Sequence, residues 1–450
     1  MQTKAVILAA GQGTRMKSSL AKVLHPLLGL PMIHYAVDTA LEVTGSKPVV
    51  VVGHSGDDVR ESIQEKAEFA VQEPQLGTGH AVMQARELLD GTAAQVLVTY
   101  ADMPLLQTDT LRELVAAQQS NRGSISMLTL QVDEARGFGR VMRDQSGKVT
   151  GIIEEAQATP EQLSIKELNA GVYCFDGRWL WQALPRIDLS PKGEYYLTDL
   201  VAMAVGEGLN VEAVSLTDPQ EAIGINNRVH LAEAEAILRQ RINKAWMIAG
   251  VTISDPATTY IEPGVDIGQD TVILPNTHLQ GTTRIGENCQ IGPNTIVLDT
   301  QIGNRCRINN SVLESAILED LVDIGPFAHL RKGAHLARGV HMGNFGEVKN
   351  SYLGPGTKMG HFSYMGDAST GADVNIGAGT ITCNYDGERK HPTDIEEGAF
   401  IGSDTMLVAP VKIGRGARTG AGSVVTRDVP PDTVVAGVPA RAIRKLEKDD

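Results

Sequence analysis

The sequence has few cysteines, a deficit of basic charge and no long apolar run. Its four cysteines, Cys174, Cys289, Cys306 and Cys383, are scattered without a Cys-x-x-Cys pair, which argues against a zinc site or a disulfide framework. Forty Lys and Arg against 54 Asp and Glu give a formal charge of −14, which argues against a nucleic-acid-binding surface. A phosphate ligand would therefore need a local basic cluster.

Membrane and export segments are also missing. No apolar run approaches the ~20 residues that a transmembrane helix needs. The apolar segment at residues 4–10 is too short for a signal peptide and turns directly into a glycine-containing loop. We therefore expect a cytoplasmic enzyme without a membrane or nucleic-acid partner. With 450 residues the chain is long enough for two or three domains.

A six-residue repeat fills most of residues 265–425. A period of six fits neither an α-helix, at about 3.6, nor a simple amphipathic strand, at about two, so each hexad is interpreted as one short strand plus a corner. Three hexads then close a triangular coil of a parallel β-helix, with the aliphatic residue inward and glycine at many corners. Glycine has no strict period of three, which argues against a collagen-like sequence. The recurring aliphatic residues are Ile267, Ile273, Leu279, Ile285, Ile291, Val297, Ile324, Leu330, Leu336, Met342, Leu353, Met359, Met365, Ile395, Ile401, Leu407 and Ile413.

This stretch resembles the left-handed hexapeptide-repeat acyltransferases. Parallel crossovers are normally right-handed, so the left hand is an implication of the resemblance alone. The same resemblance implies a homotrimer assembled through the β-helix.

The N-terminal half alternates strand-like apolar runs with amphipathic helical stretches. This alternation predicts a Rossmann-like α/β domain, with a mostly parallel sheet covered by helices on both faces. Ligands of such sheets bind at the carboxyl ends of the strands. The apolar runs are residues 5–10, 48–52, 96–100, 124–130, 170–175 and 211–216.

The first of these runs leads into Leu-Ala-Ala-Gly-Gln-Gly-Thr-Arg-Met (residues 8–16), with Lys22 further on. Small residues allow the backbone to approach a base or phosphate, and the basic side chains would neutralise phosphate charge. Met16 occupies the position where a Walker loop or a dinucleotide fingerprint has glycine, so the loop is neither. Taken alone, these residues favour an ordinary strand-to-helix turn over a phosphate site.

The loop closely resembles that of the sugar-nucleotide pyrophosphorylases, and the resemblance extends over the whole N-terminal half. It implies that Gln72 bonds the pyrimidine edge of UTP and that Gly139, Glu154 and Asn169 hold an N-acetylhexosamine. Without the family these residues are ordinary loop, turn and strand-end positions. The full set that the resemblance assigns to UTP or UDP-N-acetylglucosamine is Leu8, Ala9, Ala10, Gly11, Arg15, Lys22, Gln72, Gly77, Thr78, Tyr100, Asp102, Gly139, Glu154, Asn169 and Asn226.

Asp102 is the candidate metal ligand, because it follows the buried run at residues 96–100. A hard divalent cation prefers oxygen ligands and bridges nucleotide phosphates with one or two protein groups. The alternative is that Asp102 caps the helix expected to begin near Thr108. The resemblance favours the metal, one or two Mg²⁺ ions, and supplies Asn226 as a second ligand.

A long helix is predicted over residues 229–249, where apolar residues form one stripe. We interpret it as a rigid connector; packing as a final helix of the first domain would change only the boundary. The expected organisation is a nucleotidyltransferase domain at residues 1–226, a connecting helix at 227–250, and a β-helix with a C-terminal tail at 251–450.

The repeat carries its own candidate site. Arg331 and Lys349 place cations where the repeat prefers small or neutral residues, and His361 lies on a coil. A polar loop at residues 384–394 then breaks the six-residue register. A lone histidine is more often an ordinary surface or core residue than a catalytic one, so the residues alone do not settle its role.

Together the two halves resemble the family of bifunctional N-acetylglucosamine-1-phosphate uridyltransferases and glucosamine-1-phosphate acetyltransferases, which makes UDP-N-acetylglucosamine for peptidoglycan and lipopolysaccharide precursors. The resemblance implies that acetyl-CoA acetylates glucosamine 1-phosphate, and that UTP then donates UMP to the product with release of pyrophosphate. It assigns glucosamine 1-phosphate to Arg331, Lys349, Tyr364 and Asn375, acetyl-CoA to Ala378, Asn384, Tyr385, Ser403 and Ala421, and catalysis to His361.

The chemistry suits these roles. An amine attacks a thioester only when unprotonated, and an imidazole is suited to take its proton. A backbone N–H in the turn at residues 376–379 would stabilise the oxyanion. One departure concerns the C-terminal end, where the family commonly has an arginine that reaches the coenzyme. This chain has Gly437 there, so Arg441 or Arg444 replaces the contact, or the contact is absent.

Two other interpretations stay open on the sequence alone. One is a single-activity sugar-1-phosphate nucleotidyltransferase whose β-helix only oligomerises it, and the other is a non-catalytic scaffold.

Overall fold

A computed structural model describes residues 2–53, 56–133, 135 and 137–446. It divides into two compact units, Met1–Leu238 and Arg239–Asp450. Helix α9 (Arg228–Ile248) runs from the first unit into the second, so the division falls within a helix. Among the described residues, none of the helices combines the length and the apolar character required to cross a membrane.

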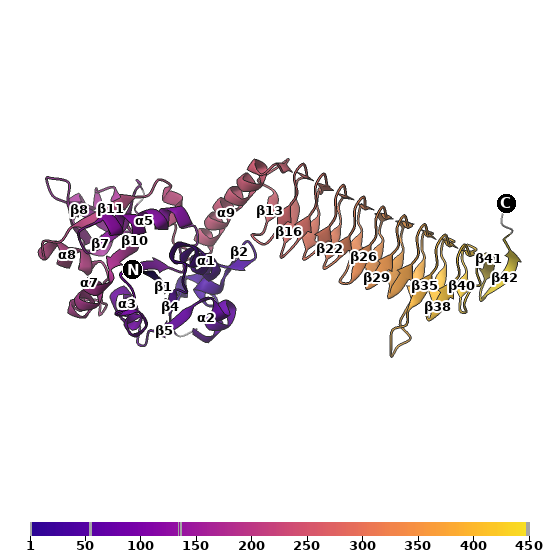
Figure 1. Cartoon of the computed structure of the whole chain (residues 1–450), viewed down its shortest axis with the longest axis horizontal. Coiled ribbons are helices and arrows are strands. Elements are labelled where there is room, and N and C mark those ends of the chain that lie inside the picture. Colours follow the sequence, from indigo (N-terminus) through magenta and orange to yellow (C-terminus); the bar gives the residue numbers. More distant parts are fainter. Residues whose placement is uncertain (1, 54–55, 134, 136, 447–450) are drawn as a thin grey trace. The chain divides into compact units, whose positions relative to one another are not determined.

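The first unit is an α/β domain around one mixed sheet (Figure 1). The main strand order is β11-β7-β10-β6-β1-β4-β5, with β1 parallel to β4 and β6, and β10 antiparallel to β6 and β7. The predicted mostly parallel sheet is thereby confirmed. Strands β8 and β9 form a hairpin beside β10. The strands are β1 (Thr3–Leu8), β4 (Val49–Val52), β5 (Glu68–Val71), β6 (Gln95–Tyr100), β7 (Ile125–Gln131), β8 (Arg140–Arg143), β9 (Val149–Ile153), β10 (Glu167–Asp176) and β11 (Val211–Ser215), with a small hairpin of β2 (Pro26–Leu27) and β3 (Leu30–Pro31).

Helices cover both faces of this sheet. Ala5 and Ile7 of β1 belong to one core cluster with α1, α2 and α5, whereas Val6 and Leu8 belong to another with α3, α7 and α8. This division follows from the alternation of side chains along a strand. The helices are α1 (Met32–Thr44), α2 (Gly56–Ile63), α3 (Thr78–Gln84), α4 (Arg86–Leu89), α5 (Thr108–Ser120), α6 (Pro160–Leu163), α7 (Gly177–Ala183) and α8 (Asp199–Gly206).

The second unit is a parallel β-helix with three faces (Figure 1). Adjacent coils pair in parallel with an offset of 16 to 18 residues, as Val272 with Gln290 and Arg307 with Asp323 show. The offset is 25 residues where the polar loop is inserted, as Ile376 with Ile401 shows. The first face contains β12 (Thr252–Ile253), β15 (Val272–Ile273), β18 (Gln290–Ile291), β21 (Arg307–Ile308), β24 (Asp323–Ile324), β27 (His341–Asn344), β30 (Lys358–His361), β33 (Asn375–Ile376), β36 (Phe400–Ile401), β39 (Arg418–Thr419), β41 (Thr433–Gly437) and β42 (Ala440–Lys445).

The other two faces repeat the same pattern. The second face contains β13 (Thr259–Ile261), β16 (Thr277–Gln280), β19 (Ile296–Leu298), β22 (Val312–Glu314), β25 (His329–Leu330), β28 (Glu347–Lys349), β31 (Tyr364–Gly366), β34 (Ile381–Cys383), β37 (Met406–Val408) and β40 (Val424–Val425). The third face contains β14 (Asp266–Ile267), β17 (Arg284–Ile285), β20 (Gln301–Ile302), β23 (Ile317–Leu318), β26 (Ala334–Leu336), β29 (Ser351–Leu353), β32 (Ala368–Thr370), β35 (Thr393–Ile395) and β38 (Val411–Ile413).

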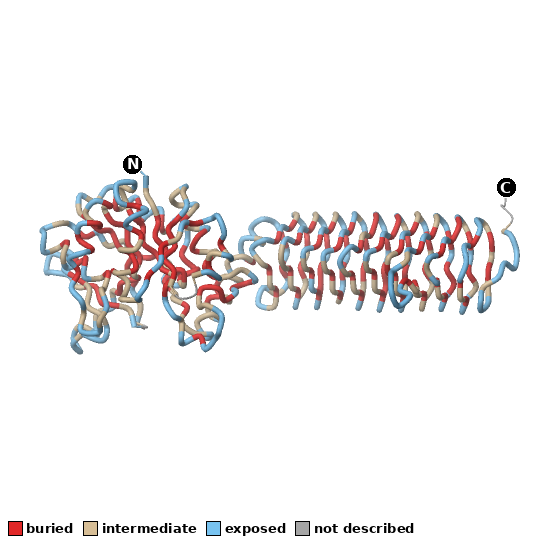
Figure 2. The backbone as a smooth tube through the Cα atoms, turned by 90° about the horizontal axis from the view of Figure 1, so that it is seen from below, coloured by how far each residue is buried: buried red, intermediate tan, exposed pale blue. Residues whose placement is uncertain are grey.

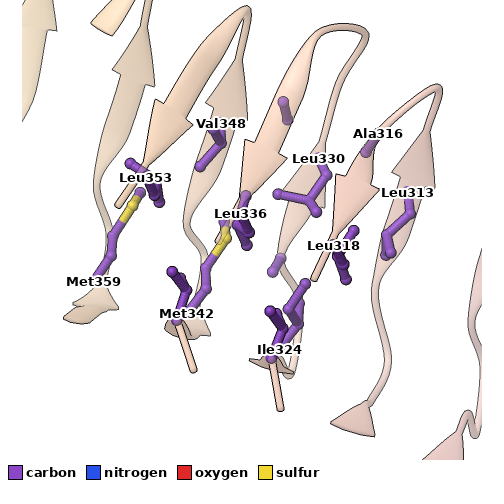
Figure 3. Packing of buried hydrophobic residues seen from close by; sticks show 14 of the residues in the cluster. Leu313, Ala316, Leu318, Ile324, Leu330, Leu336, Met342, Val348, Leu353 and Met359 are labelled. Carbon is purple, nitrogen blue, oxygen red and sulfur yellow. The ribbon is translucent and has the colours of Figure 1, made fainter. Parts of the chain in front are cut away.

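The predicted aliphatic series forms the interior of the β-helix. Buried residues recur in every coil (Figure 2). Leu330, Leu336 and Met342 come from three successive sides of one coil and are completely buried, together with their counterparts in adjacent coils (Figure 3). Burial of one such side chain contributes about 1.5–3 kcal/mol. The repeated inward residues therefore fix the positions of the corners and of the side chains at those corners.

Candidate active sites

A cavity of about 1440 Å³ in the first unit gathers the residues expected to bind nucleotide and sugar. It opens beside the carboxyl ends of the parallel strands β1 and β6, from which Leu8 and Tyr100 line it. Arg15 is the exception in the expected set, since it does not line the cavity but bonds to Asn226, which does. The expected residues that line the cavity are Leu8, Ala9, Ala10, Gly11, Lys22, Gln72, Gly77, Thr78, Tyr100, Asp102, Gly139, Glu154, Asn169 and Asn226.

Asp102 and Asn226 converge on one position. The Lys22 ammonium contacts Asp102 Oδ2 and lies 3.1 Å from Asn226 Oδ1, which also accepts a bond of 2.9 Å from Arg15. The backbone ties the two segments together, because Ile225 N donates to Asp102 O at 2.8 Å. Two oxygen ligands that face a shared positive charge fit a hard divalent cation, with phosphates as its remaining ligands.

The helix-cap alternative for Asp102 is wrong. Helix α5 begins at Thr108 and has Gln107 at its N-cap position. The carboxylate that serves this helix start is Glu221, which accepts from Gln107 N at 2.9 Å and from Thr110 Oγ1 at 3.0 Å. Asp102 therefore does not cap this helix and lines the cavity instead.

The glycine loop brings Lys22 close to the carboxyl end of β1. Gly13 has φ +62°, and a Cβ on it would lie 2.5 Å from Cβ of Lys22. Glycine is required there both for the left-handed backbone and for the close approach. Gln75 Nε2 donates to Ala10 O from the neighbouring segment. Gln75 was not among the predicted site residues, and its sequence context gave no signal for this contact.

Gln72, Gly77 and Thr78 form one end of the cavity. Gln72 Nε2 donates to Gly77 O at 2.9 Å, and Thr78 Oγ1 accepts from Leu197 N at 3.1 Å. Gly77 has φ +93°, and a Cβ on it would lie 2.7 Å from Tyr195 O. Contacts from Gln72 on one side and Leu197 on the other thus hold the loop, and Gly77 and Thr78 line the cavity.

The residues expected to hold the hexosamine form another part of the wall. Asn169 Nδ2 donates to the hydroxyl of Tyr173 at 2.7 Å, and Asn169 Oδ1 accepts from Gly171 N at 3.1 Å. Glu154 Oε1 accepts from Thr198 Oγ1 at 3.1 Å. Sequence reasoning missed Tyr173 and Thr198, which also line the cavity.

Tyr100 adds a neutral polar group near Asp102. Partial burial raises the pKa of its phenol, and the negative charges of Asp102 and Glu154 raise it further. Tyr100 therefore presents a neutral hydroxyl to the cavity at physiological pH.

Five residues of the β-helix occupy the same corner of successive coils, and together we call them the corner strip. Four of them were expected site residues and Asn344 was not. The corner strip consists of Asn344, His361, Ala378, Ser403 and Ala421. Each lies two positions after the inward residue of a first-face strand. Backbone bonds join the coils along this strip, from Gly379 N to His361 O at 3.3 Å, Asp404 N to Ala378 O at 2.7 Å and Gly422 N to Ser403 O at 2.8 Å. The histidine and three of the residues expected to bind coenzyme thus form one row.

His361 is exposed, and its ring is oriented by a residue that the sequence did not reveal. Asn344, its register partner one coil earlier, places Oδ1 against His361 Nδ1. An amide oxygen only accepts, so Nδ1 carries the proton and Nε2 keeps its lone pair. One coil later, the N–H of Ala378 donates to no described residue. A base and a free N–H donor therefore lie on neighbouring coils.

Three cations, Arg331, Lys349 and Lys390, gather where strands of the second face end. Lys349 and Arg331 come from adjacent coils, and the positive charges of Lys390 and Arg331 lower the pKa of the Lys349 ammonium. Glu347 accepts from Arg331 at 2.9 Å, and the charges of Glu314 and Asp367 also act on this cluster. Tyr364 begins the next strand of this face, and its ring crosses Gly366, where a Cβ would lie 2.3 Å from the hydroxyl oxygen.

The remaining expected residues lie farther apart in the coil. Asn375 lies on the first face, across the corner from the cation cluster. Asn384 is buried and donates to Asp367 at 2.5 Å, whereas Tyr385 is 61% exposed at the start of the polar loop and donates to Gly387 O at 2.5 Å. Sequence reasoning missed Asp367, because it precedes Asn384 by a whole coil.

The C-terminal arginines differ in position. Thr419 pairs with Val435, so Gly437 takes the next place along the corner strip after Ala421. In the antiparallel return strand β42, Arg441 pairs with Ala436, beside that place, whereas Arg444 pairs with Val434.

Comparison with known proteins agrees with the fold of both units. Residues 5–159 match the model of the MobA-like NTP transferase domain, and residues 264–299 and 392–427 match the bacterial transferase hexapeptide repeat. The fold and the sites thus define a two-part transferase, with a Rossmann-like nucleotidyltransferase domain followed by a left-handed parallel β-helix, as the sequence predicted.

Full-length relatives are more specific. The chain is 48% identical to the bifunctional protein GlmU of Heliobacterium modesticaldum, over 95% of this chain and 93% of the relative. It is 48% identical to that of Geotalea uraniireducens (96% and 95% covered) and 45% identical to that of a Geobacillus species (98% and 96%). The chain belongs to the family of bifunctional GlmU proteins. The predicted enzyme of UDP-N-acetylglucosamine synthesis, with uridyltransferase and acetyltransferase activities, is confirmed, and a scaffold or a single-activity enzyme is ruled out.

Proposed function

We propose that the cation cluster and the corner strip form the acetyltransferase site. Arg331, Lys349 and Tyr364 bind the phosphate of glucosamine 1-phosphate, and Asn375 contacts its sugar. Ala378, Ser403 and Ala421 lie along acetyl-CoA, with Asn384 and Tyr385 beside it. The cluster supports this assignment, because three neighbouring cations offer charge-assisted hydrogen bonds to a phosphate.

His361 is the general base of this step. Its Nε2 removes a proton from the attacking amine, whose nitrogen bonds to the thioester carbonyl carbon. The Ala378 N–H stabilises the resulting oxyanion. Collapse breaks the carbon–sulfur bond, and the imidazolium returns its proton to the coenzyme A thiolate. Asn344 keeps Nδ1 protonated throughout and thus keeps the base on the reacting side.

The uridyl transfer belongs to the cavity of the first unit. Gln72, Gly77 and Thr78 bind the uracil, and Gly139, Glu154 and Asn169 hold the N-acetylglucosamine moiety. Arg15 and Lys22 hold the phosphates so that the sugar phosphate oxygen attacks the α-phosphorus of UTP in line and pyrophosphate leaves. The attacking oxygen is already ionised, so no general base is needed.

Magnesium fits the Asp102–Asn226 pair. The two side-chain oxygens would hold one or two Mg²⁺ ions, which neutralise phosphate charge when bound. Among the described residues no cluster of three or more His, Cys, Asp or Glu side chains could hold a metal, so nucleotide phosphates would complete the shell. Lys22 then moves from the oxygens to the phosphates.

We further propose a cytoplasmic homotrimer assembled through the β-helix. The hexapeptide β-helix is compatible with oligomerisation. Support comes also from the split of the sugar-phosphate residues over two faces, with Asn375 across the corner from Arg331 and Lys349. A neighbouring copy would supply the missing side of such an open site. We keep residues 1–226, 227–250 and 251–450 as the functional divisions of the chain.

The observation that carries the acetyltransferase assignment is the place of His361 in the corner strip, in one row with Ala378, Ser403 and Ala421. His361→Ala is expected to lower acetyl transfer, measured as coenzyme A release, by about 10²–10⁴-fold. Pyrophosphate release from UTP should stay at the wild-type rate. Unchanged coenzyme A release would reject the proposed base.

A further inference from the structure

A hydrogen-bonded group lies behind the base end of the nucleotide cavity. Gln72, which is only 5% exposed, uses its amide nitrogen twice, toward Gly77 O at 2.9 Å and toward His80 Nδ1 at 3.2 Å. Its amide oxygen bonds to no described residue and is not among the polar atoms sealed from solvent. The nitrogen end thus faces the protein, and the oxygen end is left for the cavity that Gln72 lines.

We propose that His80 is a positioning residue that fixes the Gln72 amide and so makes the site select uracil over cytosine. This inference rests on the uridyl transfer proposed above. His80 lies on α3, behind Gln72 as seen from the cavity, and does not itself line it.

The orientation of the amide follows from donor and acceptor rules. A backbone carbonyl only accepts, so the end of Gln72 that faces Gly77 O is the nitrogen. The second hydrogen of that nitrogen points to His80 Nδ1, which accepts when the ring is neutral and carries its proton on Nε2. Gln84 Nε2 lies 3.1 Å from His80 Nε2 and donates to His80 O at 3.1 Å. The Gln84 amide must therefore turn, giving up the bond to His80 O, to place its oxygen against the ring N–H. Gln84 is only half-buried, so solvent can satisfy its nitrogen, whereas Gly77 O holds the Gln72 amide.

This orientation discriminates between the two pyrimidines. Uracil carries a hydrogen on N3, which the Gln72 oxygen accepts, whereas cytosine has a lone pair there. A glutamine that turned its amide by half a rotation would instead present NH₂ to cytosine. Turning is unfavourable here, because it would leave an oxygen against Gly77 O and against His80 Nδ1 inside the protein. Selectivity therefore depends on the residues that hold the amide.

The test compares two side chains of the same branching at position 80. His80→Leu removes the acceptor, whereas His80→Asn places an amide oxygen near the position of Nδ1. The readout is the ratio of kcat/KM for UTP to kcat/KM for CTP, with N-acetylglucosamine 1-phosphate as acceptor and pyrophosphate release as signal. His80→Leu should lower this ratio by about tenfold, and His80→Asn should keep it within about twofold of wild type.

A merely structural role predicts a different result. Loosening of the site would lower turnover of both nucleotides alike, so an unchanged ratio in His80→Leu overturns the inference. Loss of the ratio in His80→Asn as well would also overturn it. His80→Phe, which keeps a ring but offers no acceptor, repeats the test with different packing. Coenzyme A release reports in every variant that the chain is folded.

Failure of the proposed function is distinguishable. If the wild-type protein releases no pyrophosphate from UTP, the assignment of the cavity is wrong. If the wild type does so and the His80→Leu ratio is unchanged, only the role of His80 is wrong.

Discussion

At the scale of single residues, both sites keep charged or polar groups that lack a partner within the chain. The Gln72 oxygen and the Ala378 N–H have none among the described residues, and Lys390 and Arg331 lie close enough to Lys349 to lower its pKa. Such groups cost stability in the free protein and are satisfied when substrate binds.

The cation cluster predicts a pH dependence. Lys390 and Arg331 lower the Lys349 pKa in the free protein, whereas a bound phosphate dianion raises it. Affinity for glucosamine 1-phosphate is therefore constant at pH values below the free-state pKa and falls as pH rises through it. Because Lys390 is the largest cause of the lowering, Lys390→Ala should move this fall to higher pH.

The measurement is KM for glucosamine 1-phosphate as pH rises from neutrality to the ordinary lysine pKa of about 10.4. Lys332→Ala is the matched control, since Lys332 is exposed next to Arg331 and is not among the causes of the shift. Coincident pH profiles for Lys390→Ala and Lys332→Ala would contradict the account.

The C-terminal arginines give a second prediction. Arg441 lies beside the end of the corner strip and Arg444 does not, so Arg441→Ala should raise KM for acetyl-CoA by about tenfold, as expected for one charge-assisted hydrogen bond. Arg444→Ala is the control and should leave this KM within about twofold. Steady-state kinetics of coenzyme A release decide the matter, and equal effects of the two changes would exclude the assignment to Arg441.

The sequence predicted the members of both sites through family resemblance, but not the residues that orient them. Asn344, Glu347 and Asp367 act on residues 16 or 17 positions away in sequence. Whether two such residues meet depends on whether the intervening coil has 16, 17 or 18 residues, and so on the length of its corners. The role proposed for His80 could not be predicted from the sequence either, because it depends on the orientation of the Gln72 amide.

At the scale of elements, the six-residue spacing predicted the strands of the β-helix, because one inward residue per side is a physical requirement of a closed three-sided coil. The spacing slips where corners shorten, as at Ile308, Leu313 and Leu318, which lie five apart and yet are all buried. In the first unit, β8 and β9 were not predicted, because neither contains a long apolar run.

Close packing between coils gives a prediction for two glycines at equivalent positions of the adjacent first-face strands β27 and β30. A Cβ on Gly343 would lie 1.9 Å from Gly360 O, whereas a Cβ on Gly360 would meet nothing within 4 Å. Gly343→Ala should therefore lower the free energy of unfolding by about 3 kcal/mol through overpacking. Gly360→Ala should change it by about 0.5 kcal/mol or less.

The two variants are compared by urea denaturation, and the observable is a signal that reports unfolding of the β-helix. Uridyl transfer should be normal in both variants before denaturation, since the first unit is not altered. Equal free energies of unfolding for the two variants would mean that strands β27 and β30 are not packed as described.

At the scale of the whole molecule, the chain joins two units with separate cores and separate chemistry. The uridyltransferase cavity lies within Met1–Leu238 and the corner strip within Arg239–Asp450. The residues proposed for one reaction make none of the contacts described for the other. Loss of either site should therefore leave the other at full activity, and the N-acetylglucosamine 1-phosphate made at one site should serve any copy of the other.

Mixing two inactivated variants tests this central claim most directly. Asp102→Ala lacks the proposed metal ligand, and His361→Ala lacks the proposed base, so neither alone should make UDP-N-acetylglucosamine from glucosamine 1-phosphate, acetyl-CoA and UTP. Their mixture should make it, because each supplies the step that the other lacks. A mixture as inactive as its components would contradict the account.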